Sequence, residues 1–272
     1  MLEILFGSPK EARAIYSIFH SIHDKFHSEL QLVNNQSIKL NPKSWDITVK
    51  QLVIPGLIQF IINHKEHLIM LKMIKENYYF SEEEEQQQII HIAQSIMEGQ
   101  REEIPRVQEI SSREQMISDA LEQFLRPDLY FSFSSFQKFR LHKYIDSLRE
   151  YVEIAIEEYK MEQEYQSFVQ SLRDYLAKKE SKLSKLQIVF DQECLVYDQD
   201  KQLMTEHQLK KYIDKDFVYQ HPMYIDKQLL APLVSIAPDW LMLYTNNSFE
   251  GMVQTIQNIF EERVTIYPLE NF

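Results

Sequence analysis

Three histidines near the start of the chain have a spacing that suits metal chemistry. His20, His23 and His27 lie at positions i, i+3 and i+7 of a predicted helix, with Asp24 among them. Imidazoles on one helical face bind zinc or a similar cation when a carboxylate or a water completes the shell. The same histidines border the apolar stripe of that helix, which consists of Ile15, Phe19, Ile22 and Phe26. We favour amphipathic side chains at the edge of a core helix, with a metal-binding protein or metal-dependent enzyme as the alternative.

A second histidine pair lies in the run HKEH, where His64 and His67 are separated by Lys65 and Glu66. A zinc protease needs the order His-Glu-x-x-His, so that its glutamate can act as general base beside two metal ligands. The order found here excludes that motif. We interpret both histidines as residues at the edge of a helix.

Basic and aromatic residues alternate in the run QKFRLHK, residues 137–143. Such a mixture binds single-stranded nucleic acid through charge and stacking. The formal net charge of −12 disfavours a protein whose main task is to grip phosphate backbones. We therefore predict that Phe139 is a core residue and that Lys138, Arg140, His142 and Lys143 are solvated near a helix start. Nucleic acid is not among the expected partners.

The counts of glycine and cysteine exclude several kinds of chemistry. The chain has four glycines, and they lie dozens of residues apart. Dinucleotide-binding and P-loop motifs need closely spaced glycines, so that backbone amides can approach a phosphate. The single cysteine, Cys194, forms no internal disulfide and builds no thiolate metal site. We predict no cofactor and no catalytic residue, and a non-enzymatic role is preferred.

The elements that must position these residues are helices in the middle of the chain and short strands towards its ends. Period-two patterns typical of strands occur before residue 41 and after residue 185. The segments are Leu2–Phe6, Leu30–Leu40 around an Asn-Asn turn, the hairpin Leu186–Asp198, and Trp240–Thr245 and Arg263–Pro268 on either side of a helix.

This distribution predicts an α+β fold that is predominantly α-helical. We expect a single domain over residues 1–272, with an N-terminal αβ part (1–45), a helical middle (46–185) and a C-terminal αβ part (186–272). A small mixed sheet is expected to combine strands from both chain ends. In particular, Leu2–Phe6 should join the sheet of Trp240–Thr245 or Arg263–Tyr267.

The segment 134–179 carries two apolar stripes that are out of phase. The first stripe is Leu141, Ile145, Leu148, Val152, Ala155 and Tyr159, and the second is Met161, Tyr165, Phe168, Leu172 and Tyr175. One straight helix over this segment would span roughly 70 Å, whereas a compact body of this length is about 50 Å across. We predict two helices, or one helix bent near Met161–Glu164.

The most apolar stretch, Leu52–Ile62, has about half the ~20 residues that a membrane span needs, and it contains Pro55 and Gln59. It is interpreted as a buried helix behind a proline. The sequence shows no basic and apolar leader after Met1. We expect a cytoplasmic protein that binds no membrane.

The chain resembles the YtxC-like sporulation proteins of endospore-forming bacteria. The resemblance rests on FRLHKYIDSLREYVEIAIEEYKMEQEYQSFV, residues 139–169, and on TIQNIFEERVTIY near the C-terminus. It implies a sporulation-linked cytoplasmic protein without an established activity. The surface tyrosines Tyr151, Tyr159 and Tyr165 suit a core boundary or a protein interface. A protein partner or self-association is therefore expected.

Overall fold

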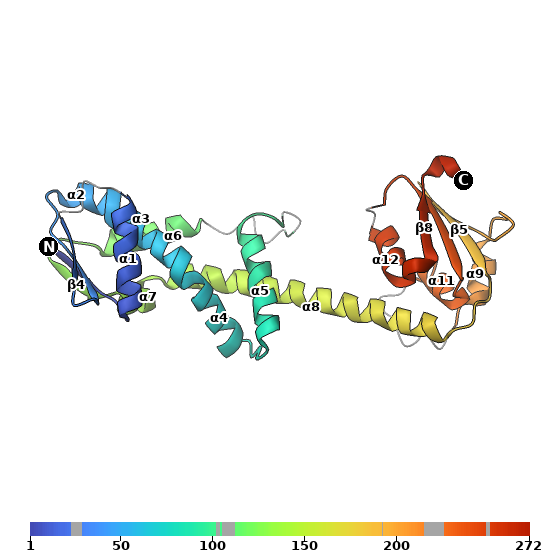
Figure 1. The fold of residues 1–272 in the computed structure, drawn as a ribbon, viewed down its shortest axis with the longest axis horizontal. Helices are drawn as coiled ribbons and strands as arrows, with labels where there is room; N and C mark the ends of the chain where they lie inside the picture. Colours follow the sequence, from blue (N-terminus) through green and yellow to red (C-terminus); the bar gives the residue numbers. More distant parts are fainter. Residues whose placement is uncertain (23–28, 102–103, 105–111, 192, 215–225, 249–250) are drawn as a thin grey trace. The chain divides into compact units, whose positions relative to one another are not determined.

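The computed structural model describes residues 1–22, 29–101, 104, 112–191, 193–214, 226–248 and 251–272. It has a helix-dominated α+β fold, as predicted. The chain divides into two compact units, Met1–Lys160 and Met161–Phe272. Figure 1 shows the elements of each. The prediction of a single domain over residues 1–272 stays a prediction, which the cooperativity of unfolding can test.

The first unit contains a four-stranded sheet in the order β2-β3-β1-β4. Its strands are β1 (Leu2–Leu5), β2 (Leu30–Val33), β3 (Ser37–Leu40) and β4 (Leu129–Ser132). β3 is antiparallel to both β1 and β2, whereas β4 is parallel to β1. The predicted turn is present, since Asn34 and Asn35 have φ values of 51° and 55°, a conformation that Asn tolerates well.

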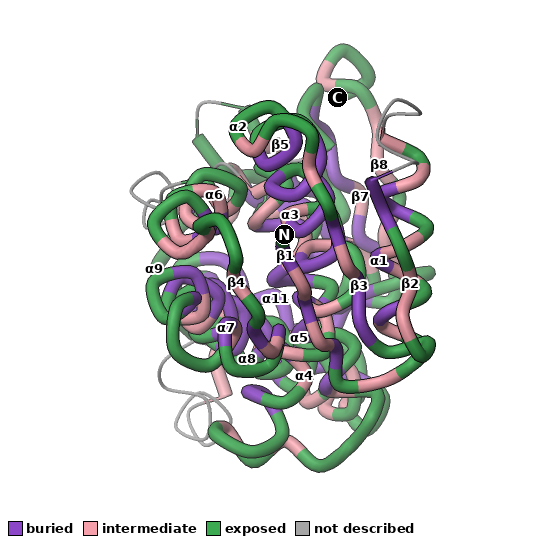
Figure 2. Tube along the Cα trace, turned by 90° about the vertical axis from the view of Figure 1, so that its left-hand side faces the viewer, coloured by how far each residue is buried: buried purple, intermediate pink, exposed green. Residues whose placement is uncertain are grey.

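The helices of the first unit surround one continuous apolar core. They are α1 (Pro9–Ile22), α2 (Trp45–Thr48), α3 (Ile54–Phe60), α4 (His67–Glu76), α5 (Glu83–Met97), α6 (Arg113–Phe124) and α7 (Phe133–Arg140), with π-helical segments η2 (Val49–Val53) and η3 (Ile61–Glu66). Figure 2 marks the buried positions in purple. Three buried phenylalanines, one directly after β1 and one each from α3 and α7, pack together with ring centroids 5.3–5.6 Å apart: Phe6, Phe60 and Phe133.

Two residues of α3 explain how the helical run 45–76 packs. Pro55 has no amide hydrogen and cannot make an α-helical bond to the carbonyl four residues earlier, and the wider turn η2 lies directly before α3. Gly56 lets α1 approach, because a Cβ at this position would lie 2.4 Å from the ring of Phe19. The stretch Leu52–Ile62 is therefore helical as expected, but Pro55 lies within the helical run rather than at its start.

The same run, Trp45–Glu76, is the one described helix that is long and apolar enough to cross a membrane. Half of its most apolar 18-residue window is buried inside the fold. A core helix of a soluble protein has this property.

The second unit contains a four-stranded sheet in the order β6-β5-β7-β8. Its strands are β5 (Lys185–Phe190), β6 (Cys194–Tyr197), β7 (Trp240–Thr245) and β8 (Val264–Tyr267). β5 and β6 form the predicted antiparallel hairpin, and β7 pairs in parallel with both β5 and β8. Its helical elements are α9 (Glu206–Tyr212), α11 (Leu230–Ile236), α12 (Gly251–Phe260), η5 (Glu261–Arg263) and η6 (Leu269–Asn271). The predicted strand–helix–strand order around α12 is confirmed.

The prediction of one sheet shared by the two chain ends is wrong. The described strands form two sheets, and β1 pairs with β3 and β4 rather than with β7 or β8. β4 lies inside the predicted helical middle, where four residues are too few to show a strand period. Because β4 completes the N-terminal sheet and β5 joins the C-terminal one, each set of strands finds partners within its own unit.

One continuous helix, α8 (His142–Lys178), replaces the predicted pair of helices, whereas the alternative of a bend near Met161–Glu164 stays a prediction. The interruption lies at Leu141 instead, between α7 and α8. The two out-of-phase stripes belong to different cores: Leu148 and Val152 pack in the first unit, and Phe168 and Leu172 in the second. The change of phase therefore marks the boundary between units, not a break in the helix.

Candidate functional site

The structure places one of the three predicted metal-binding histidines. His20 lies in the last turn of α1, and its ring packs against Tyr16 with centroids 4.4 Å apart. His23 and His27 lie outside the described residues, so a metal site formed by His20, His23 and His27 stays a prediction. Elsewhere in the described chain no group of three His, Cys, Asp or Glu residues is arranged to hold a metal ion.

The second histidine pair flanks a residue of greater interest. His64 is exposed and its ring lies 5.5 Å from that of Phe60, which fits the predicted helix edge. Glu66, in contrast, is only 5% exposed. Sequence reasoning passed over this carboxylate, although its spacing to the buried Met70 and Ile74, at i+4 and i+8, places it on the core face.

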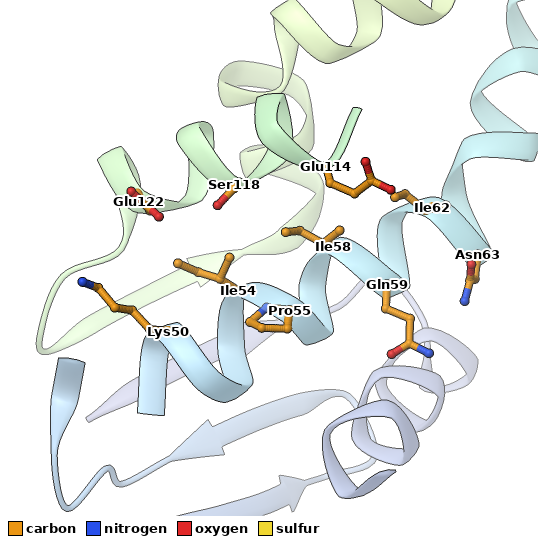
Figure 3. A pocket seen from close by; sticks show the side chains of 10 residues that line it. All are labelled: Lys50, Ile54, Pro55, Ile58, Gln59, Ile62, Asn63, Glu114, Ser118 and Glu122. Carbon is orange, nitrogen blue, oxygen red and sulfur yellow. The ribbon is translucent and has the colours of Figure 1, made fainter. Parts of the chain in front are cut away.

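A groove of about 730 Å³ lies on the first unit between the run η2–α3–η3 and helix α6. Figure 3 shows the two walls facing each other. The first wall contributes Lys50, Ile54, Pro55, Ile58, Gln59, Ile62 and Asn63, and α6 contributes Glu114, Ser118 and Glu122.

Each wall presents a ladder of side chains at i, i+4 and i+8. The ladder on the first wall is apolar: Ile54 is buried, and Ile58 and Ile62 are half-buried. The ladder on α6 is Glu114, Ser118 and Glu122. The adjoining face of α6 carries the buried residues Ile117 and Leu121. Helical periodicity thus sends the polar side chains of α6 towards the groove and its apolar ones into the core.

The α6 wall is negatively charged. The Ser112 hydroxyl donates a hydrogen bond of 2.8 Å to Oε2 of Glu114. This bond, together with a backbone hydrogen bond and the nearby Arg113, lowers the pKa of Glu114. Glu114 is therefore ionised at neutral pH. Lys50 lies at the end of the groove near Glu122 (Figure 3).

A buried polar cluster joins the two walls at one end. Glu66, the last residue of η3, accepts a hydrogen bond from Arg113 Nη1 at 2.6 Å and another from the Tyr144 hydroxyl at 2.8 Å. Arg113 is the first residue of α6, and Tyr144 lies in α8. The cluster therefore fixes where η3 and α6 lie relative to each other, and so the width of the groove.

Burial dominates the electrostatics of this cluster. It raises the pKa of Glu66, an effect that the charge of Arg113 and the hydrogen bond from Tyr144 offset in part. Burial and the carboxylate of Glu66 together raise the pKa of Tyr144 far above its usual range, so this hydroxyl stays protonated and acts as a donor. The cluster is a structural anchor that satisfies its own charges.

The site is thus an open groove with an apolar helical ladder on one wall and an acidic one on the other. Comparison with known protein families identifies the family of this chain. The model of the YtxC-like family matches residues 51–265, so this chain belongs to that family. The matched range includes all the groove residues except Lys50.

A relative from Bacillus subtilis (strain 168), described as "Uncharacterized protein YtxC", is similar to this chain throughout. The two sequences are 40% identical over 272 residues, which cover all of this chain and 96% of the relative. No solved structure matches this chain. The family resemblance predicted from residues 139–169 and the C-terminal run is confirmed.

Proposed function

We propose that this chain is a non-enzymatic interaction protein of the sporulation programme, and that it acts in the cytoplasm. Its groove between η2–α3–η3 and α6 binds an amphipathic helix of a protein partner. The observation that carries this proposal is the pair of facing ladders, Ile54, Ile58 and Ile62 on one side and Glu114, Ser118 and Glu122 on the other.

The chemistry of the groove determines its occupant. A helix that docks in a groove inserts apolar side chains that recur about once per turn, and the isoleucine ladder also offers one apolar side chain per turn. The carboxylates of Glu114 and Glu122 would pair with Lys or Arg side chains on the flank of the partner helix that faces α6. The expected partner is therefore an amphipathic helix with one apolar stripe and one basic flank.

The proposed cellular setting rests on two observations. The resemblance to sporulation proteins supports a role in spore formation. Half of the most apolar window of Trp45–Glu76 is buried inside the fold, which supports a core helix rather than a membrane span. The groove lining supplies apolar contact and negative charge, which suits binding rather than bond-breaking chemistry.

Two designed peptides test the binding mode directly. Both carry leucines at i, i+4 and i+8, and one has lysines on its flank whereas the other has glutamates. Fluorescence anisotropy should show binding of the lysine peptide only. The double variant Glu114→Lys/Glu122→Lys should weaken the lysine peptide about 2- to 30-fold, the effect of two exposed ion pairs, and should favour the glutamate peptide. The variant Ile58→Asp should abolish binding of the lysine peptide.

The control is Glu83→Lys/Glu84→Lys, which makes the same charge change at exposed positions in the first turn of α5. It should leave peptide affinity unchanged. Equal losses of peptide affinity in both double variants would mean that net charge alone causes the effect, and would contradict binding of the peptide in the groove.

The sporulation role needs a separate test in cells. In Bacillus subtilis the 40% identical relative can be deleted and replaced by this chain, and heat-resistant spores counted. We expect a deficit in the deletion strain, restored by the native chain and not by Ile58→Asp. An unchanged spore count after deletion would reject the sporulation role. It would not affect the proposal that the groove binds a helix, which the peptide experiment tests separately.

A further inference from the structure

A cluster of exposed basic residues surrounds the junction of α7 and α8. Leu141 is buried and holds the junction against the core. On either side of it, four basic side chains and one aromatic ring are exposed. We call this set the basic corner: Lys138, Phe139, Arg140, His142 and Lys143.

The prediction that Phe139 is a core residue is wrong, because its side chain is 66% exposed. Helix α7 uses Phe133 and Phe136 as its buried face, and both are almost fully buried. Position 139 lies one turn beyond Phe136, at the end of a helix of eight residues, where the core no longer covers it. A large apolar ring is thus presented to solvent among cations.

The cations of the basic corner are not neutralised within the described chain. No carboxylate of a described residue lies within 4.0 Å of Lys138, Arg140 or Lys143. The acids nearest in sequence have other partners. Asp128 pairs with the amino terminus at 3.2 Å, and Asp146 pairs with Arg149 at 2.6 Å.

Aromatic rings hold two of these cations in place. Lys138 Nζ lies 5.5 Å from the centroid of the Phe139 ring, and the Arg140 guanidinium lies 5.6 Å from that of Phe124. Contacts of this kind orient a cation and leave its hydrogen-bond donors available. Capping of α7 explains Lys138 and Arg140 in its last turn, but not Lys143 in the first turn of α8, where acidic residues are the stabilising choice.

We infer that the basic corner binds single-stranded nucleic acid, independently of the groove. Three cations without acidic partners supply charge for the phosphates of a strand, and the exposed ring of Phe139 offers a platform on which a base can stack. The chain's net charge of −12 does not prevent this. At physiological ionic strength charges more than about 8 Å away are largely screened, so a phosphate at the corner meets mainly the local cations.

A membrane surface would use the same charges differently. Stable attachment to a membrane takes two signals, such as an acyl chain or an inserted apolar face combined with a basic patch. The corner has one exposed apolar side chain, Phe139, set between Lys138 and Arg140. One ring among cations suits stacking on a base better than insertion into lipid.

The test uses fluorescein-labelled oligo-uridine and oligo-thymidine of equal length, with the full chain, measured by anisotropy over a series of salt concentrations. The plot of log K against log salt should have a slope near −2, because three phosphate contacts contribute about 0.7 each for single strands. Arg140→Ala should reduce that slope by about 0.7. Phe139→Ala should weaken binding about 5- to 100-fold by removing one stacked base. Tighter binding of oligo-uridine would identify RNA as the ligand, and equal or tighter binding of oligo-thymidine would extend it to DNA.

Matched controls are Tyr79→Ala, which removes another exposed ring (84% exposed), and Lys72→Ala, which removes a cation paired with Glu76. Neither should change affinity, and the exposed variants should melt as the native chain does. The inference fails if neither oligonucleotide binds at low ionic strength, or if Phe139→Ala and Tyr79→Ala bind alike. Binding to phosphatidylserine vesicles without binding to either oligonucleotide would show that the basic corner binds membranes, and it would also reject the inference of nucleic-acid binding.

Discussion

Arg113 Nη1 lies 2.6 Å from Oε1 of Glu66, and this partly buried contact connects the last residue of η3 to the first residue of α6. The two residues are 47 positions apart in the sequence. Because the same two elements form the walls of the groove, the ion pair sets the separation of the isoleucine and glutamate ladders. Loss of the pair should therefore affect binding as well as stability.

Removal of the Glu66 carboxylate should destabilise the protein strongly. Glu66→Ala leaves the Arg113 guanidinium and the buried Tyr144 hydroxyl without their acceptor, and should cost about 3–5 kcal/mol of unfolding free energy. The exposed Glu82→Ala should cost less than about 0.5 kcal/mol. Urea denaturation at neutral pH measures both. A small loss for Glu66→Ala would show that the cluster does not hold the groove walls together.

The pH dependence of stability should carry the signature of Glu66. Because burial raises its pKa above the ordinary value of 4.5, the folded chain holds this proton more tightly than the unfolded chain. The contribution of the group is then full below pH 4.5, and it is lost as the pH rises through the raised folded value. Glu66→Gln should remove this decline. Identical profiles of unfolding free energy for the native chain and Glu66→Gln, between pH 4.5 and 7, would contradict the raised pKa.

Gly56 should tolerate no side chain. In Gly56→Ala the new Cβ would lie 2.4 Å from two atoms of the fully buried Phe19 ring, and overpacking of this kind costs about 1–3 kcal/mol. Gly251→Ala is the matched control, since a Cβ there meets no atom of the described residues within 4 Å. Thermal melts should show a lower melting temperature for Gly56→Ala and little change for Gly251→Ala.

The histidines near the chain start give a prediction about metal content. If they border a core helix, His20→Ala/His23→Ala should change stability only modestly and the purified chain should show no metal dependence. The contact of His20 with Tyr16 fits a packing role. Elemental analysis after dialysis decides. Roughly stoichiometric zinc or manganese in the native chain, lost in the double variant, would establish the metal site instead.

Local sequence patterns predicted the helices and strands well, but they did not predict which strands pair with each other. The hairpins, the helical middle and the strand–helix–strand order around α12 follow from periodicity and turn residues within a few positions. The pairing of β1 with β4 joins Leu2 to Leu129, and no local pattern encodes such a contact. The same holds for the site. The predicted helical middle contains both ladders, but only tertiary packing brings α3 and α6 together as walls of one groove.

Two residues show that residue type alone does not predict burial. Phe139 has the residue type of a core position, yet the end of α7 leaves it exposed. Glu66 has the type of a surface position, yet η3 turns it inward, where Arg113 and Tyr144 satisfy it. In both cases the neighbours in space outweigh the propensity of the residue itself.

Helix α8 supplies core residues to both units and thereby provides a test of the predicted single domain. Leu148 and Leu172 are fully buried in the first and second cores respectively, so each alanine variant should cost about 2–5 kcal/mol. Glu150→Ala, at an exposed position of α8, should cost less than about 0.5 kcal/mol. An equally small shift for Leu148→Ala would mean that its stripe is a binding surface rather than a core.

Calorimetry of the two leucine variants then distinguishes one cooperative domain from two. In a single domain over residues 1–272, Leu148→Ala and Leu172→Ala shift one common transition, because every part of the chain unfolds together. The continuity of α8 from His142 to Lys178 favours this outcome, since unfolding of either core would leave half of the helix without its packing, and isolated helical segments are marginal in water. Two transitions, each moved by only one of the variants, would instead show that the change of stripe phase separates two independently folding domains.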